Sequence, residues 1–289
     1  MIKSMTPLIS LITVVMNDTI GLKATADSIL VQKYQNFEWL IVDGYSSDGS
    51  WELAQELGSQ PKVTVFQAPP RGIYGAMNLG AEKSCAPWLW FINAGDVLLT
   101  NETVGKIAKV AELNYSASAI ATPVVYLTST NYYYSLSLPR IMETSLGNYA
   151  FFHHQGCILN STCFNEIGGF DETLRFAADG KLLDSVIKQA SPVISPHVSV
   201  GFEMGGATSK NFKKSLEEIR VYRKLAMTNQ EIVTYQFKEF LRGLMLKLID
   251  KPFVKDLLQL YISHRELSVI EQANLAGLDL PLKRDNYDK

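Results

Sequence analysis

Short apolar runs alternate with segments of helical spacing along the first 92 residues, and this alternation limits the possible folds more than any other feature. The strand-like runs are residues 8–16, 37–42, 62–66 and 88–92, and the helical segments between them are residues 20–32, 51–57 and 72–84. The runs are rich in aliphatic and β-branched side chains, which is typical of strands buried on both faces. Strands and helices that alternate in this way build a parallel sheet through right-handed crossovers. We therefore expect an α/β fold with a mixed, mostly parallel sheet flanked by helices.

Polar residues stand at or beyond the end of each predicted strand. They are Thr13 and Asn17 for the first strand, Asp43 for the second, Arg71 for the third and Asp96 for the fourth. The carboxyl ends of parallel strands meet at one edge of the sheet, where α/β proteins bind ligands, so the pattern favours a binding cleft there. Each of these residues also suits an ordinary turn or helix cap. Asp48, which precedes Gly49, fits that simpler role best.

The stretch from Trp88 to Asp96 combines the most apolar of these strands with an abrupt polar ending, Asn93-Ala94-Gly95-Asp96. A carboxylate just past a buried strand can hold a divalent metal, which in turn can hold a nucleotide diphosphate. The same four residues can equally form a common Asn/Gly/Asp turn. This stretch by itself leaves both interpretations open.

The middle of the chain is less regular, with a predicted helix at residues 103–114 and strands at 120–128 and 132–138 that could form a hairpin. His153, His154 and Gln155 interrupt an apolar segment. Buried imidazoles often serve only to satisfy backbone groups, so a functional role stays open for them. Asp179 precedes a predicted helix at residues 180–190. It can be a helix cap or a base that faces a cleft.

The strand pattern stops at about residue 211, so we divide the chain into a domain of residues 1–210 and a helical C-terminal extension of residues 211–289. The predicted helices of the extension are residues 217–227, 231–249 and 253–262. One of them carries an apolar stripe flanked by Lys and Arg: Phe237, Phe240, Leu241, Leu244, Met245 and Leu248. This stripe can pack on the core, lie on a membrane surface or form a dimer interface.

Composition excludes several classes of protein. The net charge of −2 and the pI of about 6.1 argue against a nucleic-acid partner. Three cysteines without a CxxC pair are typical of a reducing cytosol. Residues 1–7 do not resemble a signal peptide, and no apolar run is long enough to span a bilayer. We expect a cytoplasmic protein, either free or peripheral on the inner face of the cytoplasmic membrane. No Gly-x-Gly-x-x-Gly follows the first strand, which argues against a dinucleotide-dependent oxidoreductase.

Eight segments in order resemble the family 2 glycosyltransferases with the GT-A fold, a nucleotide-diphospho-sugar transferase fold that is Rossmann-like. They are residues 12–17, 41–50, 71–80, 91–96, 154–155, 168–171, 177–179 and 204–209. The chain is particularly similar to the WcaE-like branch of colanic acid and polysaccharide biosynthesis enzymes. The resemblance implies an inverting transfer of a sugar from a nucleotide-diphosphate donor to a hydroxyl of a polysaccharide or lipid-linked saccharide.

The resemblance also implies roles for individual residues. Asp179 would be the general base, and Asp96 would bind Mg²⁺ or Mn²⁺. The nucleotide would contact Thr13, Val15, Asn17, Asp43, Ser46, Asp48, Arg71 and Gly72. The donor sugar or the acceptor would contact Tyr74, Asn78, Asn93, Ala94, His154 and Gln155.

The chain departs from the family pattern in three places. Asn93 and Gly95 stand where many relatives have further metal-binding acids, Gly75 stands where close relatives have Asp, and Gly180-Lys181 follows Asp179 where relatives often continue Tyr-Asp. The reduced metal motif keeps an alternative open, in which the chain is a non-catalytic nucleotide-sugar-binding or scaffold member of the same fold.

Overall fold

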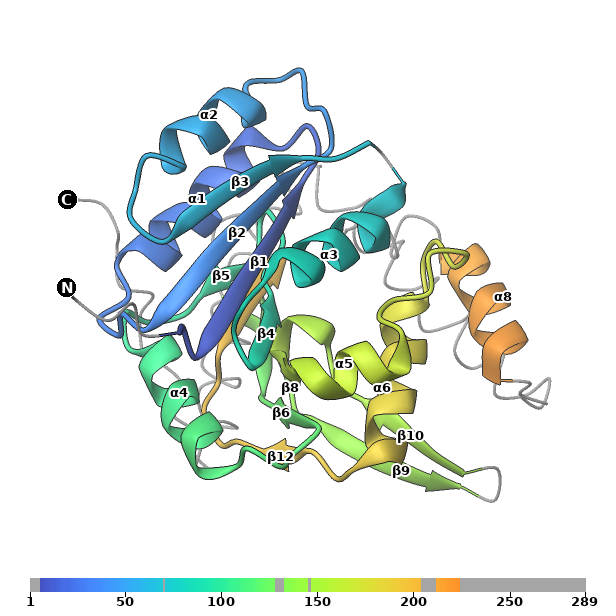
Figure 1. Cartoon of the computed structure of the whole chain (residues 1–289). Coiled ribbons are helices and arrows are strands. Elements are labelled where there is room, and N and C mark those ends of the chain that lie inside the picture. Colours follow the sequence, from blue (N-terminus) through green and yellow to red (C-terminus); the bar gives the residue numbers. More distant parts are fainter. Residues whose placement is uncertain (1–5, 70, 128–132, 145–146, 204–211, 224–289) are drawn as a thin grey trace, which may run out of the picture.

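A seven-stranded sheet forms the centre of the computed structural model, which describes residues 6–69, 71–127, 133–144, 147–203 and 212–223 (Figure 1). In spatial order its strands are β12 (Val193–Ile194), β6 (Ala119–Ala121), β11 (Cys157–Asn160), β4 (Trp88–Phe91), β1 (Ile9–Val15), β2 (Phe37–Asp43) and β3 (Val63–Gln67). Strand β11 runs antiparallel to both of its neighbours, and the other paired strands are parallel. The predicted mixed, mostly parallel sheet is confirmed.

Helices cover both faces of this sheet. On one face lie α1 (Thr19–Leu30), α2 (Ser50–Leu57) and α4 (Thr103–Leu113), and on the other lie α3 (Gly72–Lys83), α5 (Ser161–Ile167) and α6 (Ala178–Gln189). Successive strand residues serve opposite layers, because side chains alternate across a strand: Leu11 packs with the first group and Ile12 with the second. Gly80 lets α3 approach β1, since a Cβ there would lie 2.4 Å from Cγ2 of Ile12.

Two smaller sheets complete the described fold. A four-stranded sheet has the order β5 (Val97–Leu98), β13 (Val200–Glu203), β7 (Val124–Leu127) and β8 (Tyr133–Ser137). A hairpin joins β9 (Arg140–Thr144) to β10 (Gly147–Phe151), and a short 3-10 turn, η1 (His154–Gly156), follows. The predicted hairpin is confirmed as the antiparallel pair of β7 and β8.

The single strand predicted at residues 120–128 is wrong. It divides into β6 and β7, which belong to different sheets. The break falls at Thr122 and Pro123. The N–H and the hydroxyl of Thr122 both donate to the carbonyl of Gly156, at 2.8 and 3.0 Å. Pro123 has no N–H to contribute to a strand ladder. The chain therefore leaves the central sheet at this point.

Helix α8 (Phe212–Arg223) is the described part of the C-terminal extension, and it packs on α6. It begins five residues before the predicted helix at 217–227. The predicted boundary at residues 210 and 211, the later helices and the stripe from Phe237 to Leu248 lie outside the described residues. Within the described part of the chain, no helix is long and apolar enough to cross a membrane.

Candidate active site

Asp43 stands at the carboxyl end of β2, level with Val15 of β1 and Gln67 of β3. Its Oδ2 atom accepts hydrogen bonds from the Ser46 N–H at 3.0 Å and from Nε2 of Gln67 at 3.2 Å. Its Oδ1 atom is buried and has no hydrogen-bond partner among the described residues. A buried acceptor without a partner is costly, so this oxygen suits a donor group on a ligand.

The loops after β1 and β2 are tied together through Asn17. Its N–H donates to Oγ of Ser46 at 2.9 Å, and its Oδ1 accepts from the Ser47 N–H at 2.9 Å. Asn17 and Tyr45 both have left-handed backbone conformations, with φ of 54° and 61°. Such conformations are uncommon outside glycine and persist only where the surroundings enforce them. These two loops therefore form a rigid rim beside Asp43.

Asp48 braces the same rim from its exposed side. Its carboxylate accepts from the Thr19 N–H at 3.0 Å, from the Ser50 N–H at 3.0 Å and from the Ser50 hydroxyl at 2.6 Å. The hydrogen bond from the Ser50 hydroxyl is the main cause that lowers the pKa of Asp48 to about 2, and the other hydrogen bonds act in the same direction. They join the start of α1 to the start of α2, which matches the cap role that its sequence suggests.

Thr13 and Val15 lie within the core at the end of β1. The Thr13 hydroxyl donates to the Ile92 carbonyl at 2.7 Å and accepts from Nε1 of Trp39 at 2.9 Å. Both described hydrogen bonds of this hydroxyl join it to buried protein groups. Thr13 therefore holds β1 against the segment that follows β4.

The polar ending of β4 is a tight turn built around Asp96. The Asn93 N–H donates to Oδ2 of Asp96 at 2.9 Å, and Gly95 has φ of 93°. Thr25 of α1 fastens the turn: its hydroxyl donates to the Asp96 carbonyl at 2.7 Å and accepts from the Gly95 N–H at 3.0 Å. The turn interpretation is therefore correct, and it leaves the Asp96 carboxyl buried.

Burial raises the pKa of Asp96 to about 7, although the charge of His154, the Asn93 N–H and the side chain of Gln155 act in the opposite direction. The carboxyl group is thus about half ionised near neutral pH. A cation brought beside it would favour its ionised form.

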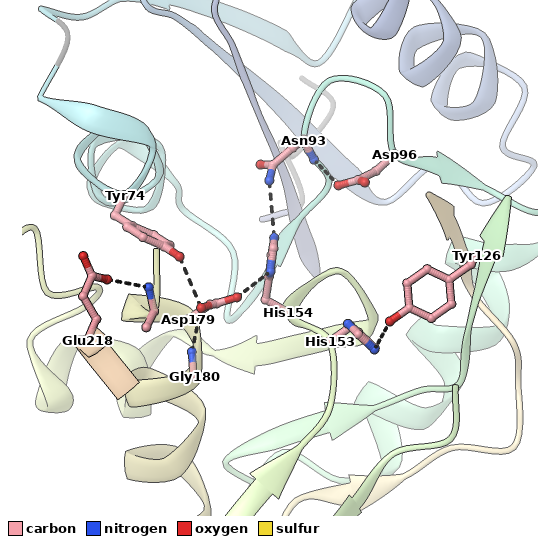
Figure 2. A network of polar contacts seen from close by, with 10 residues as sticks. Tyr74, Asn93, Asp96, Tyr126, His153, His154, Asp179, Gly180 and Glu218 are labelled. Atoms are coloured by element: carbon pink, nitrogen blue, oxygen red, sulfur yellow. Dashed lines mark hydrogen bonds and ion pairs between the residues drawn. The ribbon is translucent and has the colours of Figure 1, made fainter. Parts of the chain in front are cut away.

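Asp179, His154 and Tyr74 form the centre of a polar network (Figure 2). Oδ2 of Asp179 lies 3.3 Å from Nδ1 of His154. Oδ1 accepts from the Tyr74 hydroxyl at 3.2 Å and from the Gly180 N–H at 2.8 Å. Burial alone would raise the pKa of Asp179, but the hydrogen bond and charge of His154, with help from Gly180 and Tyr74, hold it below its usual value. The carboxylate is therefore ionised at neutral pH.

His154 continues the network toward Asp96 (Figure 2). Burial would lower the pKa of His154, but the hydrogen bond and charge of Asp179 outweigh it and raise that pKa. Nε2 of His154 lies 3.3 Å from Nδ2 of Asn93, whose Oδ1 is buried without a partner in the described residues. A protonated imidazole needs a hydrogen-bond acceptor at Nε2. Flipping the Asn93 side-chain amide, so that its oxygen and nitrogen exchange places, puts Oδ1 opposite Nε2 and gives that oxygen a donor. The network then runs continuously from Asp96 through Asn93 and His154 to Asp179.

The family model for glycosyl transferase family 2 matches residues 10–170, which is more than half of the chain and includes Asp43, Asp96 and His154. The chain belongs to glycosyl transferase family 2. Among curated relatives, this glycosyltransferase is 28% identical over 180 residues to a PGL/p-HBAD biosynthesis glycosyltransferase of Mycobacterium bovis, covering 60% of the chain and 67% of the relative. It is 26% identical over 212 residues to an uncharacterized glycosyltransferase of Mycobacterium tuberculosis, covering 70% of the chain and 78% of that relative.

The fold of this glycosyltransferase is that of solved GT-A structures. The crystal structure of Staphylococcus aureus TarS 1-349 in complex with UDP-GlcNAc superposes with a TM-score of 0.58 at 14% identity, covering 74% of the chain. The structure of TarS 1-349 itself gives a TM-score of 0.57 at 15% identity. The chain spans 66% and 65% of these two TarS structures, respectively. The GT-A fold expected from the sequence is confirmed.

The glycosyltransferase presents its remaining predicted donor-side residues on α3. Tyr74 stacks on Phe170, with ring centroids 5.3 Å apart. Asn78 bridges to the following segment, since its Nδ2 donates to the Phe170 carbonyl at 2.9 Å and to Oε1 of Glu172 at 3.1 Å. Arg71 and Gly72 are exposed at the start of the helix. These contacts attach α3 to the chain that leads into Asp179.

The structure thus gathers most of the predicted site residues into two groups, and the predicted residues in neither group are Thr13, Val15, Arg71, Gly72, Asn78 and Ala94. Asn17, Asp43, Ser46 and Asp48 form or brace the rim at β1 and β2, while Tyr74, Asn93, Asp96, His154, Gln155 and Asp179 share one network. The neighbouring His153 bonds to the Tyr126 hydroxyl at 3.0 Å. Sequence patterns did not single out Thr25 and Glu172, which are ordinary polar residues on helical or loop segments.

Proposed function

We propose that this glycosyltransferase inverts the anomeric centre, moving a sugar from a nucleotide-diphosphate donor to a hydroxyl of a polysaccharide or lipid-linked saccharide. The observation that carries the proposal is the carboxylate of Asp179. Contacts with His154 and Tyr74 help to keep its pKa low, and 30% of its side chain is exposed. An acceptor hydroxyl is a poor nucleophile until a base takes its proton, and a positioned carboxylate contributes about 10²- to 10⁴-fold. Attack opposite to the leaving group gives a single displacement with inversion.

We assign the nucleotide to the rim at β1 and β2. Oδ1 of Asp43, which has no partner among the described residues, is an acceptor for a ring N–H of the base, and the loops of Asn17 and Ser46 lie beside Asp43. The TarS structures with UDP and with UDP-GlcNAc make uridine nucleotides the first probes. Arg71, exposed at the start of α3, is available to contact the diphosphate.

The cofactor that we propose is Mg²⁺ or Mn²⁺, held by Asp96. Among the described residues, no group of three or more His, Cys, Asp or Glu could hold a metal ion by itself. One carboxylate is nevertheless sufficient for Mg²⁺ where phosphates and waters supply the other ligands. The buried carboxyl of Asp96, with its pKa raised to about 7, suits such a cation. A bound metal would supply Lewis-acid stabilisation of the departing diphosphate.

For the C-terminal extension we propose contact with the inner face of the cytoplasmic membrane through the stripe from Phe237 to Leu248. The motivating feature is its run of apolar residues among Lys and Arg. Liposome flotation of the full chain, compared with a variant carrying Leu241→Asp and Leu244→Asp, tests this. Equal partitioning of the two proteins onto vesicles with anionic lipid would contradict it, and a change in oligomeric state would favour a dimer interface instead.

The decisive experiment for the function is a mass-spectrometric screen of nucleotide sugars for hydrolysis by the purified protein with Mg²⁺ or Mn²⁺. We expect release of a nucleoside diphosphate from at least one donor, faster when a saccharide acceptor is added. Binding of nucleotide diphosphates without any turnover, with or without acceptors, would instead support the non-catalytic nucleotide-sugar-binding role.

A further inference from the structure

A carboxylate on α8, at the start of the C-terminal extension, reaches the chain directly before Asp179. Oε1 of Glu218 accepts from the Arg175 N–H at 2.9 Å, and Oε2 accepts from the N–H groups of Phe176 at 2.7 Å and Ala177 at 3.0 Å. Three successive N–H groups thus converge on one side chain. Such an arrangement of backbone dipoles binds anions, and hydrogen bonds to a charged acceptor are stronger than neutral ones.

These three bonds hold the backbone that enters α6, a helix without a side-chain cap of its own. Ala177 is the N-cap of α6 and has no side-chain oxygen to accept an N–H. Glu218 supplies the negative charge that the start of a helix favours, from a distant part of the sequence. Phe176, Ala177 and Ala178 are buried, so the backbone here has little room to move. Asp179 follows in the first turn of α6.

A second residue of α8 touches the same turn. The hydroxyl oxygen of Tyr222 lies 2.8 Å from where a Cβ on Gly180 would be. Glu218 and Tyr222 are four residues apart and therefore share one face of α8. Through Glu218 that face binds the backbone before Asp179, and through Tyr222 it lies against the residue after Asp179. Figure 2 shows Glu218 beside the start of α6.

We propose that Glu218 is a positioning residue for the general base: it holds residues 175–177 so that the Asp179 carboxylate points at His154 and at the reacting hydroxyl. The inference rests on the proposed function, since it concerns the base of that reaction. It makes the first helix of the C-terminal extension part of the catalytic unit. A displacement of about 1 Å in a catalytic group can lower the rate about a hundredfold.

The test compares Glu218→Gln with Glu217→Gln in the full-length protein. Gln keeps the size of Glu218 but turns one of its two acceptor oxygens into an N–H donor facing backbone N–H groups. Glu217 is an exposed neighbour on the same helix and serves as the matched control. For donor hydrolysis we expect Glu218→Gln to lower kcat about ten- to a hundredfold. KM for the donor and Kd for UDP should stay within about twofold of wild type, and Glu217→Gln should behave as wild type.

Two further measurements separate positioning from stability. Amide hydrogen exchange over residues 175–181 should accelerate in Glu218→Gln, and kcat should be assayed well below the measured Tm. Glu218→Asp, which keeps the charge, should retain more activity than Glu218→Gln. The proposal is overturned if wild type is active and Glu218→Gln matches its kcat, or if KM and Kd deteriorate together with kcat. If wild type turns over no nucleotide sugar, the proposed function itself fails, and with it the base that Glu218 would position.

Discussion

The Nδ1 atom of His154 lies 3.3 Å from Oδ2 of Asp179, and this contact sets the charge of both groups. Burial by itself would raise the pKa of Asp179 and lower that of His154, which favours the neutral forms. The pair shifts both pKa values the other way, which favours the ionised form of each group in this partly buried site. Because each charge supports the other, removing one partner leaves the second partly buried and uncompensated.

Replacement of His154 by Gln should make the activity sensitive to acid. Without the imidazolium, burial dominates and the pKa of Asp179 rises, so the base becomes protonated at a higher pH. Below that pKa, each unit of increase lowers the ionised fraction about tenfold. We expect the acidic limb of the kcat profile, which lies low in wild type because the pKa of Asp179 is depressed, to move toward neutral pH in His154→Gln.

His153→Gln is the matched control for this profile, because the imidazole of His153 bonds to the hydroxyl of Tyr126 on β7. Its acidic limb should coincide with that of wild type. Coincident profiles for His154→Gln and wild type would contradict the assignment of His154 as the group that keeps Asp179 ionised.

Asp179→Asn should abolish transfer while preserving nucleotide binding. The amide keeps the size of the carboxyl and can still accept from Tyr74 and Gly180, but it cannot take a proton. We expect kcat to fall about 10²- to 10⁴-fold. Calorimetric titration with UDP should give an unchanged Kd, since Asp43 and its rim are separate from this change. Full activity in the variant would show that another group is the base.

The sequence predicted the central strands well because each is a mostly apolar run that ends in or is followed by a polar residue, as from Phe37 to Asp43. It did not predict that β11 inserts antiparallel between β4 and β6. Cys157–Asn160 is only four residues long, and nothing in a run of that length encodes its direction or its partners. His154 enters the site because it lies directly before this strand.

Contacts within the site were less predictable than the residues that make them. The sequence analysis singled out both His154 and Asp179. It also allowed a purely structural role for each, as a buried imidazole and as a helix cap, and only the fold brings them together. Glu218 had no signal at all, because one acid on an amphipathic helix reads as a solvated face. The turn at Asp96 shows the reverse case. Its composition predicted the local geometry correctly and left open whether the carboxyl has a further function.

Gly75→Asp should be destabilising in this chain, although the resemblance suggests that close relatives carry Asp there. A Cβ at Gly75 would lie 2.9 Å from Cβ of Arg71 and 3.2 Å from Oε2 of Glu172. The new carboxylate would therefore face crowding and a like charge. We expect a loss of about 1–3 kcal/mol in the free energy of unfolding, measured by urea denaturation.

Glu172 provides the control for that substitution. Gly75→Asn has the same shape without the charge, so it should cost less than Gly75→Asp. Combining Gly75→Asp with Glu172→Gln should recover part of the loss, with a coupling energy of about 0.5–3 kcal/mol. Strictly additive effects would show that the charge of Glu172 does not oppose a carboxylate at position 75.

Asp96→Asn should change how stability depends on pH in the metal-free protein. The pKa of Asp96 is about 7 in the folded protein, against 3.8 for an unperturbed carboxyl. A group whose pKa is raised by folding contributes its stability below the unfolded pKa and loses it as pH rises through the folded value. Wild type should therefore lose stability from about pH 4 to about pH 7 through this group. The isosteric amide does not ionise, so Asp96→Asn should gain relative to wild type over that interval, as measured by denaturant unfolding.

If Asp96 is a metal ligand, metal and nucleotide together should make wild type more stable than Asp96→Asn. With Mn²⁺ and UDP present, wild type should gain stability by mass action and release a proton from Asp96 below about pH 7, because the cation favours the carboxylate. Asp96→Asn offers only a neutral oxygen and should gain less in Tm from Mn²⁺ with UDP than wild type, while UDP alone stabilises both proteins equally. The proton release can be measured by calorimetry in buffers of different ionisation enthalpy. An equal metal-dependent rise in Tm for both proteins would assign the cation to other groups and leave Asp96 as the residue that closes the turn after β4.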